Sequence, residues 1–308
     1  MSANAIPEAR LSIGDGDPEA IVGLSPSGGT SVRTGLAGLI GLIATAAFYG
    51  LLMLIPKGPF VEMMTERGPT QYLAVLFGFW SAAILLFKRQ KLAIQRRALD
   101  CPVIPANHDF VLTRQTAPDI LTTIYALVDA PERFIVFNRI QIALSSLKNL
   151  GRIGDVDDIL GSIAERDESA VSTSFGMLAG FLWAIPVLGF IGTVLGLASA
   201  IGNFSSLLDG QSDVQGIIGS LREVTGGLAT AFETTLVALV IALGLQLWIT
   251  AQRKSEEEFL DRCQDYCLRQ ILSRMRSEDA HSPSMDAAPI VTAPRPNMPV
   301  TLRDGVQR

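Results

Sequence analysis

A glutamate stands inside a long apolar stretch in the last third of the sequence. Residues 226–245 read GGLATAFETTLVALVIALGL and carry no charge apart from Glu233. Hydroxyl groups accompany it at four positions, which are Thr225, Thr230, Thr234 and Thr235. An ionisable side chain is costly inside a membrane and is a candidate functional residue by default. The stretch therefore predicts either an ion pathway or a polar contact between buried helices.

Helical spacing separates Glu233 from Thr235, because residues two apart lie about 200° apart around a helix. Glu233 shares its face with Gly226, Thr230 and Val237 instead. Burial favours the neutral acid, which can bond to a backbone carbonyl or a hydroxyl of another helix. We expect Glu233 to make such an interhelical contact, and the alternative is a direct place in a proton route.

A second apolar stretch, VLGFIGTVLGLASA at residues 187–200, places Thr193 among small residues. Small residues at four-residue spacing let helix backbones approach closely. Thr193 and Thr235 each lie in the middle of such a strip, which predicts a polar constriction if several copies surround an axis. The alternative is that each threonine bonds back to its own helix. We assign Gly189, Gly196, Ala231 and Ala238 to the pore face and Gly192, Ala200 and Gly227 to helix packing.

The sequence shows little sign of metal-binding, nucleotide-binding or catalytic sites. Cys263 and Cys267 lie on one face of a helix, but histidine occurs only at His108 and His281, so we interpret the cysteines as apolar fillers rather than metal ligands. The sequence contains no phosphate-binding glycine loop between a strand and a helix. We therefore expect no enzyme activity, no cofactor and no metal. The net charge of −5 gives no indication of a nucleic-acid partner.

The composition indicates a membrane protein, since only 18% of the 308 residues are charged and the mean hydropathy is +0.35. A membrane helix needs about 20 mostly apolar residues. Four segments qualify as spans, and they are 34–56, 68–87, 175–204 and 224–251. The fold class that we predict is an all-α membrane protein that forms a ring-shaped homo-oligomer, with spans three and four extended into the cytoplasm.

Lysine and arginine in the flanks predict the orientation of these spans. Residues 88–97, KRQKLAIQRR, contain five cations after span two, and Arg253 and Lys254 follow span four. Both termini are therefore predicted to be cytoplasmic. The expected organisation is a disordered cytoplasmic leader (1–33), peripheral transmembrane helices (34–87), a cytoplasmic helical segment (88–174), a channel core (175–253), a cytoplasmic helical extension (254–278) and a disordered tail (279–308).

The motifs WAIPVLGFIGTVLGLASAIGNF and VTGGLATAFETTLVALVIALGLQ together resemble the core of the MotA/TolQ/ExbB proton-channel family. The four spans are similar to the topology of MotA, whereas TolQ and ExbB have three. The resemblance implies a homopentamer in the bacterial inner membrane, surrounding single-span partner helices of the MotB/TolR/ExbD type. It also implies that Thr193 and Thr235 border the proton path, while the partner carries the proton-binding aspartate.

One position departs from part of the family. ExbB and TolQ carry a pore glutamate at the position where this sequence has Thr230. Glu233 is therefore not the equivalent of that pore glutamate. The function that the resemblance implies is a proton-channel subunit of a motor that converts proton-motive force into mechanical work. The alternatives are a non-conducting oligomeric scaffold in the membrane and, more narrowly, a flagellar stator subunit.

Overall fold

The structure is a computed structural model that describes residues 11–12, 19, 23, 28–104, 110–150, 153–209 and 214–275. Its elements within this part of the chain are helical, which confirms the all-α prediction. They are α2 (Thr34–Leu54), α3 (Pro59–Thr65), α4 (Pro69–Leu99), α5 (Ala117–Leu127), η1 (Pro131–Arg133), α6 (Ile135–Leu150), α7 (Ile153–Ser174), α8 (Gly176–Asp209), α9 (Val214–Gln270) and η2 (Leu272–Arg274).

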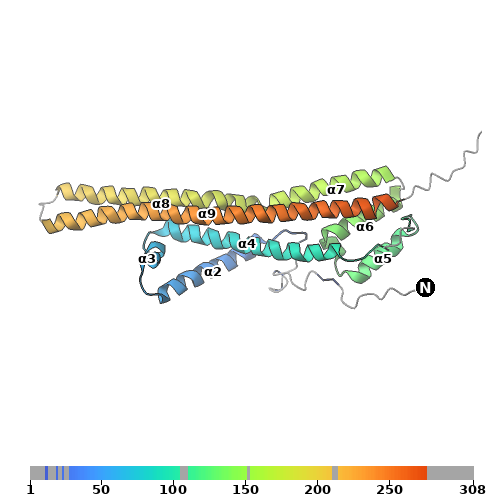
Figure 1. Cartoon of the computed structure of the whole chain (residues 1–308), viewed down its shortest axis with the longest axis horizontal. Helices are drawn as coiled ribbons and strands as arrows, with labels where there is room; N and C mark the ends of the chain where they lie inside the picture. Colours follow the sequence, from blue (N-terminus) through green and yellow to red (C-terminus); the bar gives the residue numbers. More distant parts are fainter. Residues whose placement is uncertain are drawn as a thin grey trace, which may run out of the picture.

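Helices α8 and α9 form a long antiparallel pair on which the other elements are arranged (Figure 1). At 57 residues, α9 is about 85 Å long at 1.5 Å per residue. Helix α4 packs along this pair, α2 packs against α4, and α5, α6 and α7 gather near the other end of the pair (Figure 1). Helix α9 continues past Ala251, the predicted end of span four, without interruption.

Local sequence explains where the shorter helices begin and end. Helix α2 ends before Pro56, because the residue before a proline is disfavoured in the helical region. Both α3 and α4 begin with a proline, whose missing N–H costs nothing at the first helical position. Gly68, directly before α4, has φ +104°, a conformation that other residues rarely adopt. The turn that joins α3 to α4 therefore depends on this glycine.

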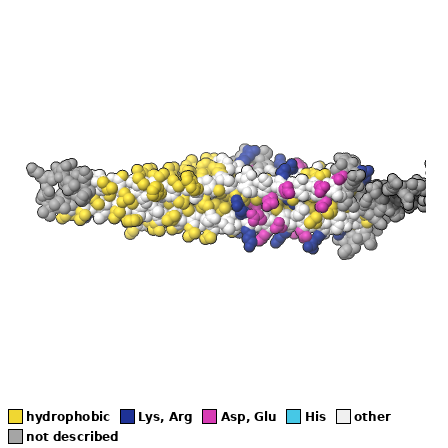
Figure 2. All heavy atoms as spheres, turned by 90° about the horizontal axis from the view of Figure 1, so that it is seen from above, with side chains coloured by type: hydrophobic (Ala, Val, Ile, Leu, Met, Phe, Trp, Pro, Cys, Tyr) yellow, Lys and Arg dark blue, Asp and Glu magenta, His cyan; other side chains and the backbone are white. Residues whose placement is uncertain are grey.

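Four helical stretches of the described chain are long and apolar enough to cross a membrane, as the sequence predicted: Thr34–Leu54, Pro69–Leu99, Gly154–Gly202 and Leu221–Arg274. We call residues 34–87, 176–209 and 214–251 the apolar half, and residues 88–175 and 252–275 the charged half. Figure 2 shows hydrophobic side chains covering the first and acidic and basic side chains gathered over the second. This arrangement indicates a multi-pass membrane protein.

The charged half holds much of a hydrophobic core that continues into the apolar half. Phe134, Phe137 and Ile140 are buried against Phe259 and the two cysteines of α9. The predicted helical segment 88–174 therefore folds onto the end of α9.

Part of the predicted leader is packed rather than free. Glu19 is fully buried and pairs with Lys91 of α4 at 2.9 Å, and Leu11 N–H donates to the carbonyl of Leu127. At these residues the structure differs from the disordered leader that we predicted over 1–33. The reason is that Lys91 of α4 and the carbonyl of Leu127, the last residue of α5, provide partners for the leader. The predicted tail at 279–308 lies outside the described residues.

Candidate functional site

The α8–α9 contact is so close that several of its positions have no room for a side chain. A Cβ added to Gly196 would lie 2.7 Å from the carbonyl oxygen of Gly227, and one added to Gly227 would lie 2.8 Å from that of Gly196. One added to Gly189 would lie 2.7 Å from the Cβ of Ala238. The backbones thus meet directly over about three turns of each helix.

All seven small residues that the sequence analysis selected lie in this contact: Gly189, Gly192, Gly196, Ala200, Gly227, Ala231 and Ala238. Gly192, Ala200 and Gly227, which the sequence assigned to helix packing, lie between the two helices in the single chain. Within one chain, the four residues assigned to a pore face pack helix against helix in the same way. Their exposure to a pore formed by several chains stays a prediction.

Thr235 joins the two helices through its hydroxyl. The half-buried Oγ1 lies 3.2 Å from the carbonyl oxygen of Ala231 in its own helix and 3.2 Å from that of Gly189 in α8, to either of which it can donate. Thr193 is also half-buried, and its Oγ1 donates to Phe190 in its own helix at 2.6 Å. The back-bonding alternative therefore describes Thr193, whereas Thr235 also reaches the neighbouring helix.

Thr193 and Thr235 lie at the same level of the helix pair. The backbone of Gly192, next to Thr193, packs against the side chain of Thr234, and Gly189 packs against Thr235. Thr234 itself is buried, and its hydroxyl bonds back to Thr230 and Ala231. Their contact with an ion pathway stays a prediction.

Glu233 has a different partner from the one predicted. Arg67, in the turn before α4, donates from Nε to Oε2 at 2.8 Å and from Nη2 to Oε1 at 3.2 Å. This two-point geometry is the strong form of a guanidinium–carboxylate pair. The partner of Glu233 is therefore a guanidinium rather than the expected backbone carbonyl or hydroxyl, because Arg67 lies within reach. Its interhelical character is retained.

Arg67 was not among the candidate site residues selected from the sequence. A signal for its role was present, because an acidic residue inside a span requires a partner and Arg67 directly precedes span two.

Helix α4 begins over the same part of the α8–α9 pair. A Cβ added to Gly192 would lie 2.6 Å from Thr234 Oγ1 and 3.1 Å from Thr70 Oγ1, so three helices meet there. Thr70 is the second residue of α4, three positions after Arg67. The ion pair thus attaches the start of α4 beside the two candidate threonines.

A second polar site, which the sequence analysis did not find, lies where the two halves of the molecule meet. Lys88 Nζ donates to Glu256 Oε2 at 3.0 Å, to Ser174 Oγ at 2.8 Å and to the carbonyl of Thr30 at 3.4 Å. The side chains of Lys88 and Glu256 are each only 1% exposed. Thr30 Oγ1 and Gln252 Nε2 also donate to the Glu256 carboxylate. The leader, α4, α7 and α9 are therefore joined by one buried charge pair.

The cysteines of α9 have the character of core residues. Cys263 and Cys267 are fully buried in the charged half, and burial raises their pKa values to about 12 and about 11. Thiolates, not thiols, bind metals and attack electrophiles. Within the described residues no cluster of three or more histidine, cysteine or carboxylate side chains could hold a metal ion.

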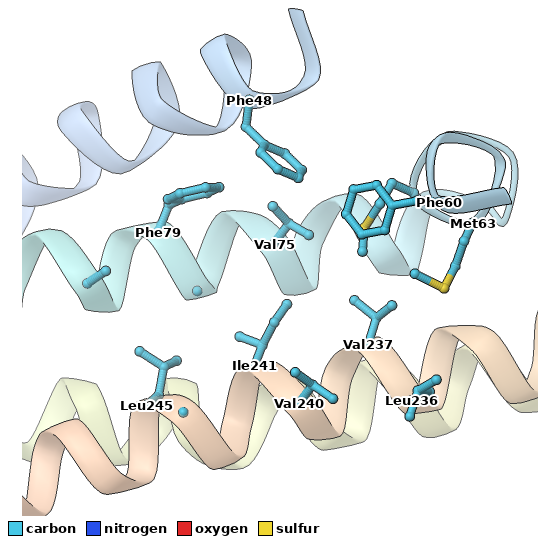
Figure 3. Close-up of a pocket in the computed structure, with 14 residues that line it drawn as sticks. Phe48, Phe60, Met63, Val75, Phe79, Leu236, Val237, Val240, Ile241 and Leu245 are labelled. Carbon is cyan, nitrogen blue, oxygen red and sulfur yellow. The ribbon is translucent and has the colours of Figure 1, made fainter. Parts of the chain in front are cut away.

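An apolar cavity of about 530 Å³ separates α9 from the peripheral helices. Its walls come from α2, α3 and α4 on one side and from α9 on the other, where Val237 and Ile241 point across toward Val75 (Figure 3). This cavity begins one helical turn beyond Glu233. Next to the ion pair, the contact between the peripheral helices and α9 is therefore only partly filled.

Comparison with known proteins was informative for one part of the chain. Comparisons with curated proteins and with solved structures gave no match. Residues 128–264, which include α6, α7, α8 and most of α9, match the MotA/TolQ/ExbB proton channel family. The matched residues contain the motifs around Thr193 and Thr235 that carry the resemblance to this family.

Proposed function

We propose that this protein is a proton-channel subunit of an inner-membrane motor. A homopentameric ring of α8–α9 pairs would surround single-span partner helices of the MotB/TolR/ExbD type and couple proton-motive force to mechanical work. The observation that carries the proposal is the family match, which includes the close α8–α9 contact holding Thr193 and Thr235 at one level. Four apolar helices of membrane-spanning length support it.

The proposed orientation puts the charged half in the cytoplasm. Lys88 to Arg97 and Arg253–Lys254 follow the apolar half at this end, whereas the α2–α3–α4 turns at the other end carry Lys57 and Arg67 beside Glu62 and Glu66. Short loops rich in lysine and arginine stay on the cytoplasmic side.

Exposed apolar side chains on α8 support assembly with other membrane segments. Trp183, Phe190 and Ile201 are each more than 60% exposed in the single chain. In a ring, lipid, a neighbouring copy or the partner helix would cover this surface.

The test is proton flux into vesicles that contain the chain and its membrane partner. Thr235→Val and Thr193→Val keep the side-chain shape and remove the hydroxyl, so we expect each to reduce flux strongly while the ring still assembles. Thr45→Val is a matched control, because Thr45 bonds back to its own helix in α2 at 2.7 Å, away from the α8–α9 contact. Full flux in both pore variants would refute the assignment. A ring that forms but passes no protons in the wild type would favour the non-conducting scaffold.

A further inference from the structure

Glu233 and Thr235 hold α9 from two nearly opposite sides. They are two residues apart and therefore about 200° apart around the helix. Glu233 is held by the guanidinium of Arg67 on the side of the peripheral helices. Thr235 lies within bonding distance of the carbonyl of Gly189 on the side of α8. A helix held on opposite sides at two such closely spaced positions cannot rotate about its axis without breaking one of the two contacts.

Side-chain packing between α9 and the peripheral helices is incomplete on this side. The helix face that carries Glu233 continues through Val237 and Ile241, and both line the apolar cavity of about 530 Å³ (Figure 3). Close-packed interiors normally have few voids larger than a water molecule. Over these two turns, Val237 is buried and Ile241 lies against Gly78 of α4, but the cavity leaves part of the contact between α9 and α4 unfilled.

We propose that Arg67 is a positioning residue for the ion pathway: its pair with Glu233 fixes the rotation of α9 and so places the Thr235 hydroxyl. The proposal rests on the proposed function insofar as Thr235 borders that pathway. It gives Glu233 a role without proton transfer and makes the α3–α4 turn part of the conducting unit. Thr70, three residues after Arg67, lies beside Thr234 at Gly192 of α8, so the same turn also contacts α8.

The first measurement reports the rotation of α9 without requiring conduction. Ala238 is fully buried against Gly189, so a thiol introduced by Ala238→Cys should react slowly with a membrane-permeant maleimide. The background is Cys101→Ser, since Cys263 and Cys267 are fully buried. Arg67→Gln and Glu233→Gln should each speed this labelling by roughly two- to thirty-fold, the range expected when a coupling contact is lost.

The second measurement is proton flux with the partner present, on the same variants. Arg67→Gln and Glu233→Gln should lower flux over a similar range, and the exchanged pair Arg67→Glu with Glu233→Arg should restore both flux and slow labelling. Glu66→Gln is the matched control, because its exposed pair with Lys57 at 3.5 Å lies one residue away from Arg67. It should change neither quantity.

The outcomes separate this inference from the proposed function. Unchanged labelling in Arg67→Gln would overturn the positioning role, whatever the flux. Lower flux that the exchanged pair fails to restore, with labelling unchanged, would make Glu233 itself a member of the proton route. A wild type that passes no protons would refute the proposed function, while the labelling rates would still decide whether Arg67 fixes α9.

Discussion

The buried pair of Lys88 and Glu256 gives the sharpest test of the structure. Glu256→Gln keeps the side-chain shape and removes the negative charge. The lysine would then remain buried with hydrogen-bond partners but without a counter-charge. Removing one partner of a buried ion pair costs about 3–5 kcal/mol, because an uncompensated charge is left behind. We expect the free energy of unfolding to fall by that amount.

The distance and burial of the pair set this magnitude. Two unit charges 3.0 Å apart attract with about 5 kcal/mol at an effective dielectric constant near 20. The side chains are each 1% exposed, so solvent screens them little. Replacing both residues, as in Lys88→Met with Glu256→Leu, removes the attraction together with the desolvation cost. Such double replacements are often neutral or stabilising, so we expect the double variant to recover most of the loss.

The assay is reversible chemical denaturation in detergent, followed by tryptophan fluorescence. Glu258→Gln is the matched control, since Glu258 also lies on α9 and faces Lys254 at 4.0 Å, but the two side chains are 50% and 77% exposed. Exposed pairs of this kind contribute about 0–1 kcal/mol. Equal losses for Glu256→Gln and Glu258→Gln would refute the reasoning, because the two pairs differ chiefly in burial.

Two further predictions concern packing. Gly196→Leu should separate α8 from α9 and abolish ring assembly, because the new Cβ would lie 2.7 Å from the backbone of Gly227. Native mass spectrometry of the variant and the wild type measures the assembly, and an intact ring in the variant would contradict the prediction. At pH 8, a maleimide should label the half-exposed Cys101 first and leave Cys263 and Cys267 unmodified until the chain is denatured, since their raised pKa values keep both thiols protonated. Mass spectrometry of the digested protein identifies the labelled cysteines. Rapid labelling of the two buried cysteines in the folded protein would contradict the prediction.

Partner choice for charged side chains was the weakest part of the sequence analysis. Glu233 was recognised as costly in a membrane, yet its partner Arg67 is 166 positions away. The same holds for Lys88 and Glu256, which are 168 positions apart. Lys88 was interpreted only as an orientation signal after span two. Charged residues have no periodicity that predicts their partners, since a pair depends on which helices become neighbours.

Local sequence patterns were enough to predict the long apolar helices and the close contact between two of them. Membrane-spanning length requires only a local run of apolar residues, and small residues at four-residue spacing predict where backbones can meet. Both are properties of a single segment, and for that reason the spans and the packing roles of Gly192, Ala200 and Gly227 could be predicted. The tertiary structure alone decided that Glu233 is paired with Arg67 and that Glu19 and Thr30 of the leader are tied to α4 and α9. Those outcomes depend on which helix lies beside which, and long-range packing rather than local pattern sets that arrangement.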